Sequence, residues 1–365
     1  MYIYFLFLIP FVHSFKLYMK SPKTNEWKHL QNSMKETARN WFVNRAIKRG
    51  IPWNELYEKN KKNQEEFEII KKEKEDESIE YPEYYTKPFH GYDDGNMNWK
   101  AALEAEAATL SIAAGYWDKV DPYEASVWMR QNITENIKSY FQNTYDWAFQ
   151  IERGFPKNVL DIGCSTGIST CYLKENMPHY TSTYGVDLSP YFLSVGTHFS
   201  NENNLSIHYV HGNAENTTFS SGMFDLIVCN FIFHELPENA ACNVINEMFR
   251  LLSEKGIVAI VDIDPHNLDK QLKNNIFRKW AFEITEPHIY NYYKRDMVTM
   301  LKDGGFINVE KRNNDPLNSV WLGTKEPLFA QYLQTAQSQK IQKKDVNEKK
   351  TTKKFVRETV TMKHN

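Results

Sequence analysis

The residues whose types and spacing could bind a ligand lie at the ends of three apolar segments in the middle of the chain. The first segment runs into the sequence D-I-G-C-S-T-G between Asp161 and Gly167, whose glycines allow a backbone to approach a ligand closely. The second ends at Asp187, 24 residues after Gly163, where a carboxylate can accept two hydrogen bonds from a ribose diol. The third precedes Asn213, whose amide can pair with the polar edge of a purine. This spacing predicts a site for a ligand that contains a nucleoside.

A fourth apolar segment, residues 224–230, leads to a candidate for proton transfer. His234 follows the carboxyl end of this segment and is the best candidate for a general base, which must lie within hydrogen-bond reach of the proton that it removes. The alternative is a structural histidine. Glu235 either orients His234 or caps the following turn.

Apolar segments alternate with amphipathic segments over the region that contains these residues. The predicted strands are 158–162, 183–187, 206–210, 224–230, 256–262, 305–311 and 318–322. The predicted helices are 168–176, 190–199, 239–252, 267–280 and 294–302. Such alternation predicts a mostly parallel sheet with helices on both faces, in which ligands bind beyond the carboxyl ends of the strands.

An aromatic segment, Tyr81–Trp99, precedes this region and lacks helical periodicity. It is expected to form a lid over the second reactant or, alternatively, a strap on the outside of the sheet. The side chains predicted to contact that reactant are Tyr84, Tyr85, His90, Asp94 and Tyr290. Core packing is the alternative for Tyr290.

These residues together resemble a class I S-adenosylmethionine-dependent methyltransferase of the type 11 branch, which includes small-molecule and quinone-ring methyltransferases. The resemblance implies an α/β fold: a Rossmann-like seven-stranded sheet with one antiparallel strand, helices on both faces and an N-terminal helical or lid extension. It implies S-adenosyl-L-methionine as the cofactor. The residues that it assigns to the cofactor are Asp161, Gly163, Cys164, Ser165, Thr166, Gly167, Asp187, Leu188, Asn213, Ala214, Asn230 and Phe231.

Within that set, the resemblance implies that residues 163–167 wrap the methionine moiety and that Asp161 holds its amino group. Asp187 would hold the ribose, and Asn213 would meet the adenine, where an aspartate is more usual. The segments 81–99, 105–109 and 285–292 are similar to a plastid-type subgroup of plants and algae. That resemblance covers about residues 81–323 and does not identify the acceptor. The acidic middle of the chain and the aromatic segment favour a neutral or apolar small molecule as the acceptor.

The two ends of the chain predict targeting and tail segments. Residues 1–14 are expected to be a signal peptide, and 15–80 a basic transit-like arm followed by a charged linker or solvated helix. The remaining expected parts are an extension over 81–150, a methyltransferase domain over 151–325 and a disordered basic tail over 326–365. The apolar N-terminal run is too short to span a membrane. We expect the protein in an organelle of the plastid type that is reached through the secretory route, or else in the secretory or endomembrane lumen.

Charge and cysteine content exclude other classes. Residues 81–339 carry a net charge of −11, so nucleic acid is not expected as the substrate. The 4 cysteines have no zinc-ligand spacing, and no metal is expected. Two alternatives remain: a catalytically silent scaffold or sensor of the same fold, and a nicotinamide-dependent oxidoreductase. The second predicts a three-glycine turn, whereas this loop has only Gly163 and Gly167.

Overall fold

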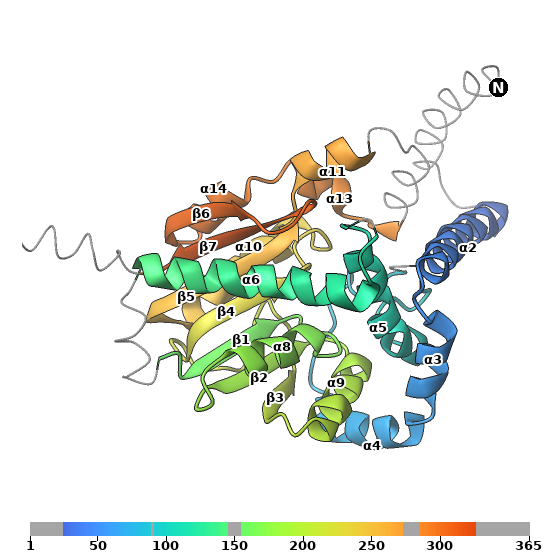
Figure 1. Ribbon diagram of the computed structural model, residues 1–365, viewed down its shortest axis with the longest axis horizontal. Helices are drawn as coiled ribbons and strands as arrows, with labels where there is room; N and C mark the ends of the chain where they lie inside the picture. The colour runs from blue at the N-terminus through green and yellow to red at the C-terminus, as the bar shows by residue number, and fades with distance from the viewer. Residues whose placement is uncertain (1–24, 89–90, 118, 145–154, 273–284, 326–365) are drawn as a thin grey trace, which may run out of the picture.

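The computed structural model describes residues 25–88, 91–117, 119–144, 155–272 and 285–325. A sheet of 7 strands in the order β3-β2-β1-β4-β5-β7-β6 forms its centre (Figure 1). The strands are β1 (Asn158–Ile162), β2 (Ser182–Asp187), β3 (Ile207–His211), β4 (Phe224–Asn230), β5 (Leu252–Ile263), β6 (Ile307–Asn313) and β7 (Asn318–Thr324). β7 is antiparallel to both of its neighbours, and the pairs from β3 to β5 are parallel. The predicted Rossmann-like seven-stranded α/β sheet is therefore confirmed.

Alternate side chains of the central strands enter two separate cores, as expected for strands covered on both faces. Leu160 and Ile227 face a core with α10 (Glu238–Leu251) and α14 (Met297–Asp303). Val159 and Leu226 face the opposite core. That core is closed by α8 (Ile168–Asn176) and by the long helix α6 (Pro122–Thr144), which lies across the sheet in Figure 1.

Helix α9 (Pro190–Glu202) begins as the sequence predicts. The Ser189 hydroxyl accepts a hydrogen bond from the backbone N–H of Phe192 at 3.3 Å, and Pro190 occupies the first turn, where its missing N–H has no consequence. The predicted helix 267–280 corresponds to α11 (Pro265–Leu272), and its remaining residues lie outside the described part. A short helix, α13 (Ile289–Tyr292), follows that gap.

Four further helices of the described N-terminal residues pack together beside the sheet in Figure 1. They are α2 (Asn25–Lys48), α3 (Trp53–Lys61), α4 (Gln64–Lys74) and α5 (Trp99–Ala114). The interpretation of residues 55–80 as a linker or solvated helix is wrong for α4, because Phe67 is fully buried against Phe192 and Val195 of α9. Trp53 of α3 likewise packs against Leu110 of α5.

The predicted domain boundary at residue 151 would put α6 and the sheet into different parts. Ile137 and Phe141 of α6 are fully buried in the second core, so α6 packs as part of the same unit as the sheet. The predicted signal peptide and the predicted tail lie outside the described residues. Among the helices that the structure does describe, none combines the length and apolar character that a membrane crossing requires.

Candidate active site

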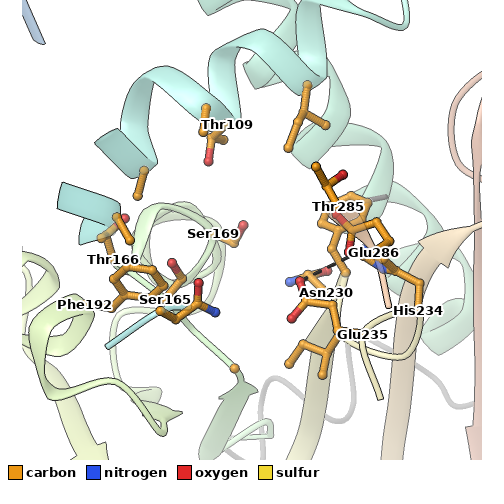
Figure 2. A pocket seen from close by; sticks show the side chains of 18 of the residues that line it. Thr109, Ser165, Thr166, Ser169, Phe192, Asn230, His234, Glu235, Thr285 and Glu286 are labelled. Atoms are coloured by element: carbon orange, nitrogen blue, oxygen red, sulfur yellow. Dashed lines mark ion pairs between the residues drawn. The ribbon is translucent and has the colours of Figure 1, made fainter. Parts of the chain in front are cut away.

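The carboxyl ends of β2, β1 and β4 meet at one edge of the sheet, because these strands are neighbours in that order. A cavity of about 500 Å³ lies at this edge. Figure 2 shows Ser165, Thr166 and Ser169 on one side of the cavity and Asn230, His234 and Glu235 on the other. Every residue that the sequence assigns to the cofactor lines this cavity except Gly167, whose left-handed backbone begins α8.

The loop between β1 and α8 has a backbone that requires glycine at its first turn. Gly163 has a φ of 66°, and a Cβ added there would lie 1.8 Å from Cδ1 of Ile232. The backbone N–H of Ser165 donates a hydrogen bond to Oδ2 of Asp187 at 2.8 Å. The loop that follows β1 is therefore fixed to the end of β2.

Asp187 retains the capacity to bind a diol. Its Oδ1 accepts from the N–H of Ser189 at 2.8 Å and its Oδ2 from that of Ser165, so each oxygen keeps a further acceptor position. Burial raises the pKa of Asp187 to about 6, against the lowering effect of these backbone hydrogen bonds. At neutral pH most of this carboxyl is ionised.

Asp161 and Asn230 form a second polar group in the cavity wall. The Thr170 hydroxyl donates to Oδ2 of Asp161 at 2.6 Å, and the amide of Asn230 donates to Oδ1 at 3.5 Å. Asp161 is 1% exposed, and burial raises its pKa to about 7. Oδ1 of Asn230 is buried and has no hydrogen-bond partner among the described residues. A carboxylate and an orphaned carbonyl oxygen together fit an ammonium group, which is present on the methionine end of S-adenosylmethionine.

Asn213 follows the end of β3, and its side chain makes one hydrogen bond within its own loop. Its Oδ1 accepts from the N–H of Glu215 at 2.9 Å, which leaves the amide N–H groups for another partner. The neighbouring Ala214 also lines the cavity. The assignment of both residues to adenine stays a prediction.

His234 forms a buried pair with Asp262 at the end of β5. Nδ1 of His234 lies 2.7 Å from Oδ1 of Asp262, and the backbone N–H of His234 donates to Oδ2 of the same carboxylate at 3.1 Å. Burial lowers the pKa of His234, but the charge and hydrogen bond of Asp262 outweigh it, so the pKa lies above its ordinary value. Nε2 lies 4.0 Å from Oε1 of Glu235, which also lines the cavity. Because Asp262 holds Nδ1, Nε2 is the atom that could exchange a proton with a bound molecule.

The predicted acceptor residues divide into three groups. Tyr84 and Tyr85 line the cavity, and the Tyr84 hydroxyl donates to Oε1 of Glu215 at 2.7 Å. Asp94 is exposed and Tyr290 is 40% exposed, and neither lines the cavity, so the prediction that they face the acceptor is not supported for either. His90 lies outside the described residues.

Several lining residues were not predicted from the sequence. The far wall comes from α2 and α5, including Trp41, Phe42, Ala105 and Ala108. Arg130 of α6 also lines the cavity, and a buried arginine cannot be distinguished from an exposed one by its sequence alone. Asp262 could have been found, because it is an acidic residue at the end of a predicted strand.

The strand order, the single antiparallel strand and the acidic side chains at the ends of β1 and β2 define a class I S-adenosylmethionine-dependent methyltransferase fold. Residues 159–256 of this protein match the family model described as a methyltransferase domain. Its cofactor is S-adenosyl-L-methionine. Among the described residues, no group of three or more His, Cys, Asp or Glu side chains is arranged to hold a metal ion.

Known proteins with similar sequences are methyltransferases. An uncharacterised methyltransferase of Synechocystis is 32% identical over 107 residues, which are 29% of this chain and 47% of that protein. A demethylmenaquinone methyltransferase of Staphylococcus haemolyticus is 29% identical over 104 residues, or 28% of this chain and 42% of that protein. The chain thus spans about half the length of the curated relatives that it matches first.

Solved structures with a similar fold include a SAM-dependent methyltransferase from Aquifex aeolicus. It has 17% sequence identity and a TM-score of 0.36, and the match covers 54% of this chain and 98% of that one. The plantazolicin methyltransferase BpumL, solved in complex with SAH, has 16% identity and a TM-score of 0.40, with coverage of 60% and 95%.

Proposed function

We propose that this protein transfers a methyl group from S-adenosylmethionine to a small-molecule acceptor by in-line displacement. The observation that carries the proposal is the convergence of Asp161, Asp187 and His234 on one cavity at the switch point of the sheet. The cofactor supplies a methyl group that is already activated on a sulfonium. The protein then has to align the two reactants and exclude water, which can contribute up to about 7–11 kcal/mol.

The cavity has a cofactor part and an acceptor part, which are lined by different residues of this chain. We assign Asp187 to the hydroxyl groups of the ribose and Asp161 with Asn230 to the ammonium group, since all three line the cavity. His234 lies on the opposite side, with Nε2 toward Glu235. We assign His234 to the acceptor's proton, where one must be lost, because its other ring nitrogen is held by Asp262.

The lining of the acceptor part of the cavity favours an acceptor that is mostly uncharged. Trp41 and Phe42 of α2 and Ala105 and Ala108 of α5 line it, so much of this wall is apolar. The nearby charge of Arg39 is neutralised, because it forms an ion pair with the buried Glu104. The demethylmenaquinone methyltransferases among the relatives make a quinone ring a reasonable first acceptor to test.

The test combines cofactor binding with turnover. Purified protein is incubated with S-adenosylmethionine and cell extract, and formation of S-adenosylhomocysteine is measured. Asp187→Ala and Gly163→Arg are each expected to abolish cofactor binding, the second because any side chain at position 163 collides with Ile232. The control is Asp303→Ala, which changes an exposed carboxylate on α14.

Three other outcomes would contradict the proposal. If the unaltered protein did not bind the cofactor, the proposal that it is a methyltransferase would be excluded. Unchanged affinity in both variants would refute the placement of the site. Tight binding with no product in any extract would favour the scaffold or sensor.

The finer resemblance to a plastid-type subgroup supports a proposal for location. We propose delivery through the secretory route to a plastid-type organelle, directed by residues 1–54. A fluorescent protein fused behind these residues should accumulate in that organelle. Accumulation in the cytosol would contradict it, and retention in the endomembrane lumen would favour the alternative.

A further inference from the structure

His211 joins the sheet to a segment of the N-terminal region. It is the last residue of β3 and is 5% exposed. Its Nδ1 accepts a hydrogen bond from the backbone N–H of Asp76 at 2.9 Å. Its Nε2 lies 3.0 Å from the backbone oxygen of Leu188 and 3.0 Å from the Tyr81 hydroxyl. One imidazole therefore contacts both the segment 76–85 and a residue that lines the cavity.

These contacts define the protonation state of the His211 ring. A backbone N–H can only donate, so Nδ1 has to present a lone pair to Asp76. A carbonyl oxygen can only accept, so Nε2 has to carry the hydrogen that faces Leu188. The observed arrangement therefore requires the neutral imidazole. A proton added at Nδ1 would place two donors face to face and remove the hydrogen bond to the segment.

The same segment forms part of the cavity wall. Tyr84 and Tyr85 line the cavity, as Asp187 does. Tyr81 stacks on Tyr85, with ring centroids 6.3 Å apart and planes at 12°. Burial and, after it, the charge of Asp187 raise the pKa of Tyr85, so this ring lies near the carboxylate assigned to the ribose. The Tyr84 hydroxyl fixes the other end of the segment by donating to Glu215 at 2.7 Å.

The charged and titratable groups that face His211 come from the end of α4, from the segment and from the end of β2. They are Lys71, Lys74, Glu75, Asp76, Tyr81 and Asp187. Glu75 forms an ion pair with Lys71, and the Asp76 carboxylate accepts from the N–H and the hydroxyl of Ser78 at 2.9 and 2.6 Å. The contact of His211 with Asp76 is therefore to the backbone, while the nearby carboxylates have partners of their own.

Burial has the largest effect on the pKa of His211 and lowers it below its ordinary value. The hydrogen bond to Leu188 and the charges of Glu75 and Asp76 act in the opposite direction, and the charge of Lys71 adds to the lowering. The contacts of the segment thus favour the neutral ring. Their stabilising contribution is complete above the ordinary value of 6.5 and is lost as the pH falls below it.

We propose that residues 76–85 form a closure over the cofactor part of the cavity, and that His211 releases this closure when its ring takes up a proton. The proposal rests on the proposed function, because the bound cofactor is what the closure retains. With the neutral ring, the segment is held at His211 and at Glu215, and the cofactor exchanges slowly. With the protonated ring, one of these two attachments is lost and the cofactor exchanges faster.

The first experiment measures the segment itself, without any ligand. Hydrogen–deuterium exchange of peptides that cover residues 76–85 is compared at about pH 5.5 and about pH 7.5, after correction for the intrinsic exchange rates. In the unaltered protein, protection should be lower by about 2–10-fold at the lower pH, as expected for the loss of one hydrogen bond. In His211→Asn, an amide oxygen near the position of Nδ1 still accepts from Asp76 but does not titrate, so protection should be equal at both pH values.

Two further variants serve as matched comparisons for His211→Asn. His211→Gln places its amide near the position of Nε2 and leaves the N–H of Asp76 without an acceptor, so the segment should exchange fast at both pH values. His208→Asn changes an exposed histidine of the same strand and should keep the pH dependence of the unaltered protein.

The second experiment measures the release of S-adenosylhomocysteine by stopped-flow fluorescence. Proteins are compared with one another at one pH, so that the carboxyls of Asp161 and Asp187 contribute equally to each. At the lower pH, the ligand should leave the unaltered protein about 2–10-fold faster than it leaves His211→Asn. At the higher pH, the two proteins should release it at the same rate.

The two experiments separate the closure from the proposed function. Equal protection of the segment at both pH values in the unaltered protein would overturn the closure. A pH dependence that persists in His211→Asn would assign it to another group and overturn the role of His211. Equal release from both proteins at the lower pH would show that the segment does not retain the cofactor, while the proposed function would stand. Failure of the unaltered protein to bind S-adenosylhomocysteine would overturn the proposed function and the retaining role together.

A variant of the segment tests the same contact if His211→Asn does not fold. Tyr81→Phe removes the hydroxyl that faces Nε2 and leaves β3 unaltered. It should raise the exchange of residues 76–85 at the higher pH towards the level of the unaltered protein at the lower pH. Unchanged exchange in Tyr81→Phe would then overturn the closure.

Discussion

Asp161 and Asp187 lie in a part of the molecule where burial opposes their ionisation. Burial raises the pKa of Asp161 to about 7 and that of Asp187 to about 6, so both lose their protons within the physiological range. Their ionised forms are the ones that accept hydrogen bonds from an ammonium group or a diol. Proton release and cofactor binding should therefore be linked.

We predict that affinity for S-adenosylhomocysteine rises as the pH rises from about 5 to 8, because the ionised fraction of both carboxyls grows over this window. Asp161→Asn should bind more weakly and lose the upper part of the dependence. Without ligand, both groups hold more protons in the folded protein than in the unfolded chain between pH 3.8 and about 7, so their contribution to stability falls as the pH rises over that range. Calorimetric titrations at several pH values test this, and a flat profile in the unaltered protein would contradict it.

The His234–Asp262 pair predicts a separate pH dependence, which concerns the rate of turnover. Its raised pKa keeps His234 protonated at neutral pH, so a base role requires the rate of methyl transfer to rise with pH above neutrality. His234→Gln should lower the rate by about 10²–10⁴-fold, remove this rise and leave cofactor affinity unchanged. The ion pair also stabilises the fold at neutral pH, and this contribution is lost as the pH rises through the raised pKa. A normal rate in His234→Gln would assign the residue a structural role.

The sequence predicted those site residues that follow strands and failed where tertiary packing decides. The end of a predicted strand is a defined place, so Asp161, Asp187 and His234 could be assigned to one edge of a sheet. Arg130 and Phe42 reach the cavity from helices whose orientation toward the sheet no local pattern specifies. The prediction for Tyr290 is not supported for the same reason. Tyr292 of the short helix α13 is buried, whereas Tyr290 of the same helix is 40% exposed.

At the scale of the elements, the N-terminal helices show how a charged segment can still belong to a core. α4 has seven charged residues in its sequence QEEFEIIKKEK, yet Phe67 and Ile70 lie one turn apart and are both buried. Two apolar residues at this spacing were too few to distinguish a packed helix from a solvated one. The contact of α4 with α9 became visible only in the fold.

We predict that Phe67→Ala destabilises the protein by about 3–5 kcal/mol, the usual loss for a buried phenylalanine. Ile69→Ala, on the same helix but with 60% of its residue surface exposed, should change stability by less than about 0.5 kcal/mol. Urea unfolding of both variants measures the difference. Equal small effects would mean that α4 is not part of the cooperative core.

At the scale of the whole molecule, α6 makes the N-terminal region inseparable from the catalytic sheet. Ile133, Ile137, Tyr140 and Phe141 cover the strands on one face. The predicted order of the seven strands after residue 155 was correct. Nothing in the sequence after that point reveals that one face of the sheet needs a helix from before it. The resemblance implied one antiparallel strand, but the position of β7 between β5 and β6 became known only from the fold.

A chain that begins at residue 151 is therefore expected not to fold cooperatively, because the apolar face that contains Val159 and Leu226 would be exposed to water. A chain that begins at residue 25 retains α6 and should unfold in a single cooperative transition. Circular dichroism melting distinguishes the two. Cooperative unfolding of the shorter chain would show that α6 is dispensable for the sheet.

The place of β7 also bears on the order in which the protein can be completed during synthesis. The chain leaves the ribosome from its N-terminus, and β7 is the last described strand to emerge. Until residues 318–324 are available, β6 has no partner in the sheet and β5 presents an open edge to other chains. A premature stop codon before Asn318 therefore removes more than one strand. It detaches β6, leaves the central sheet open to aggregation and makes the nascent protein dependent on chaperones.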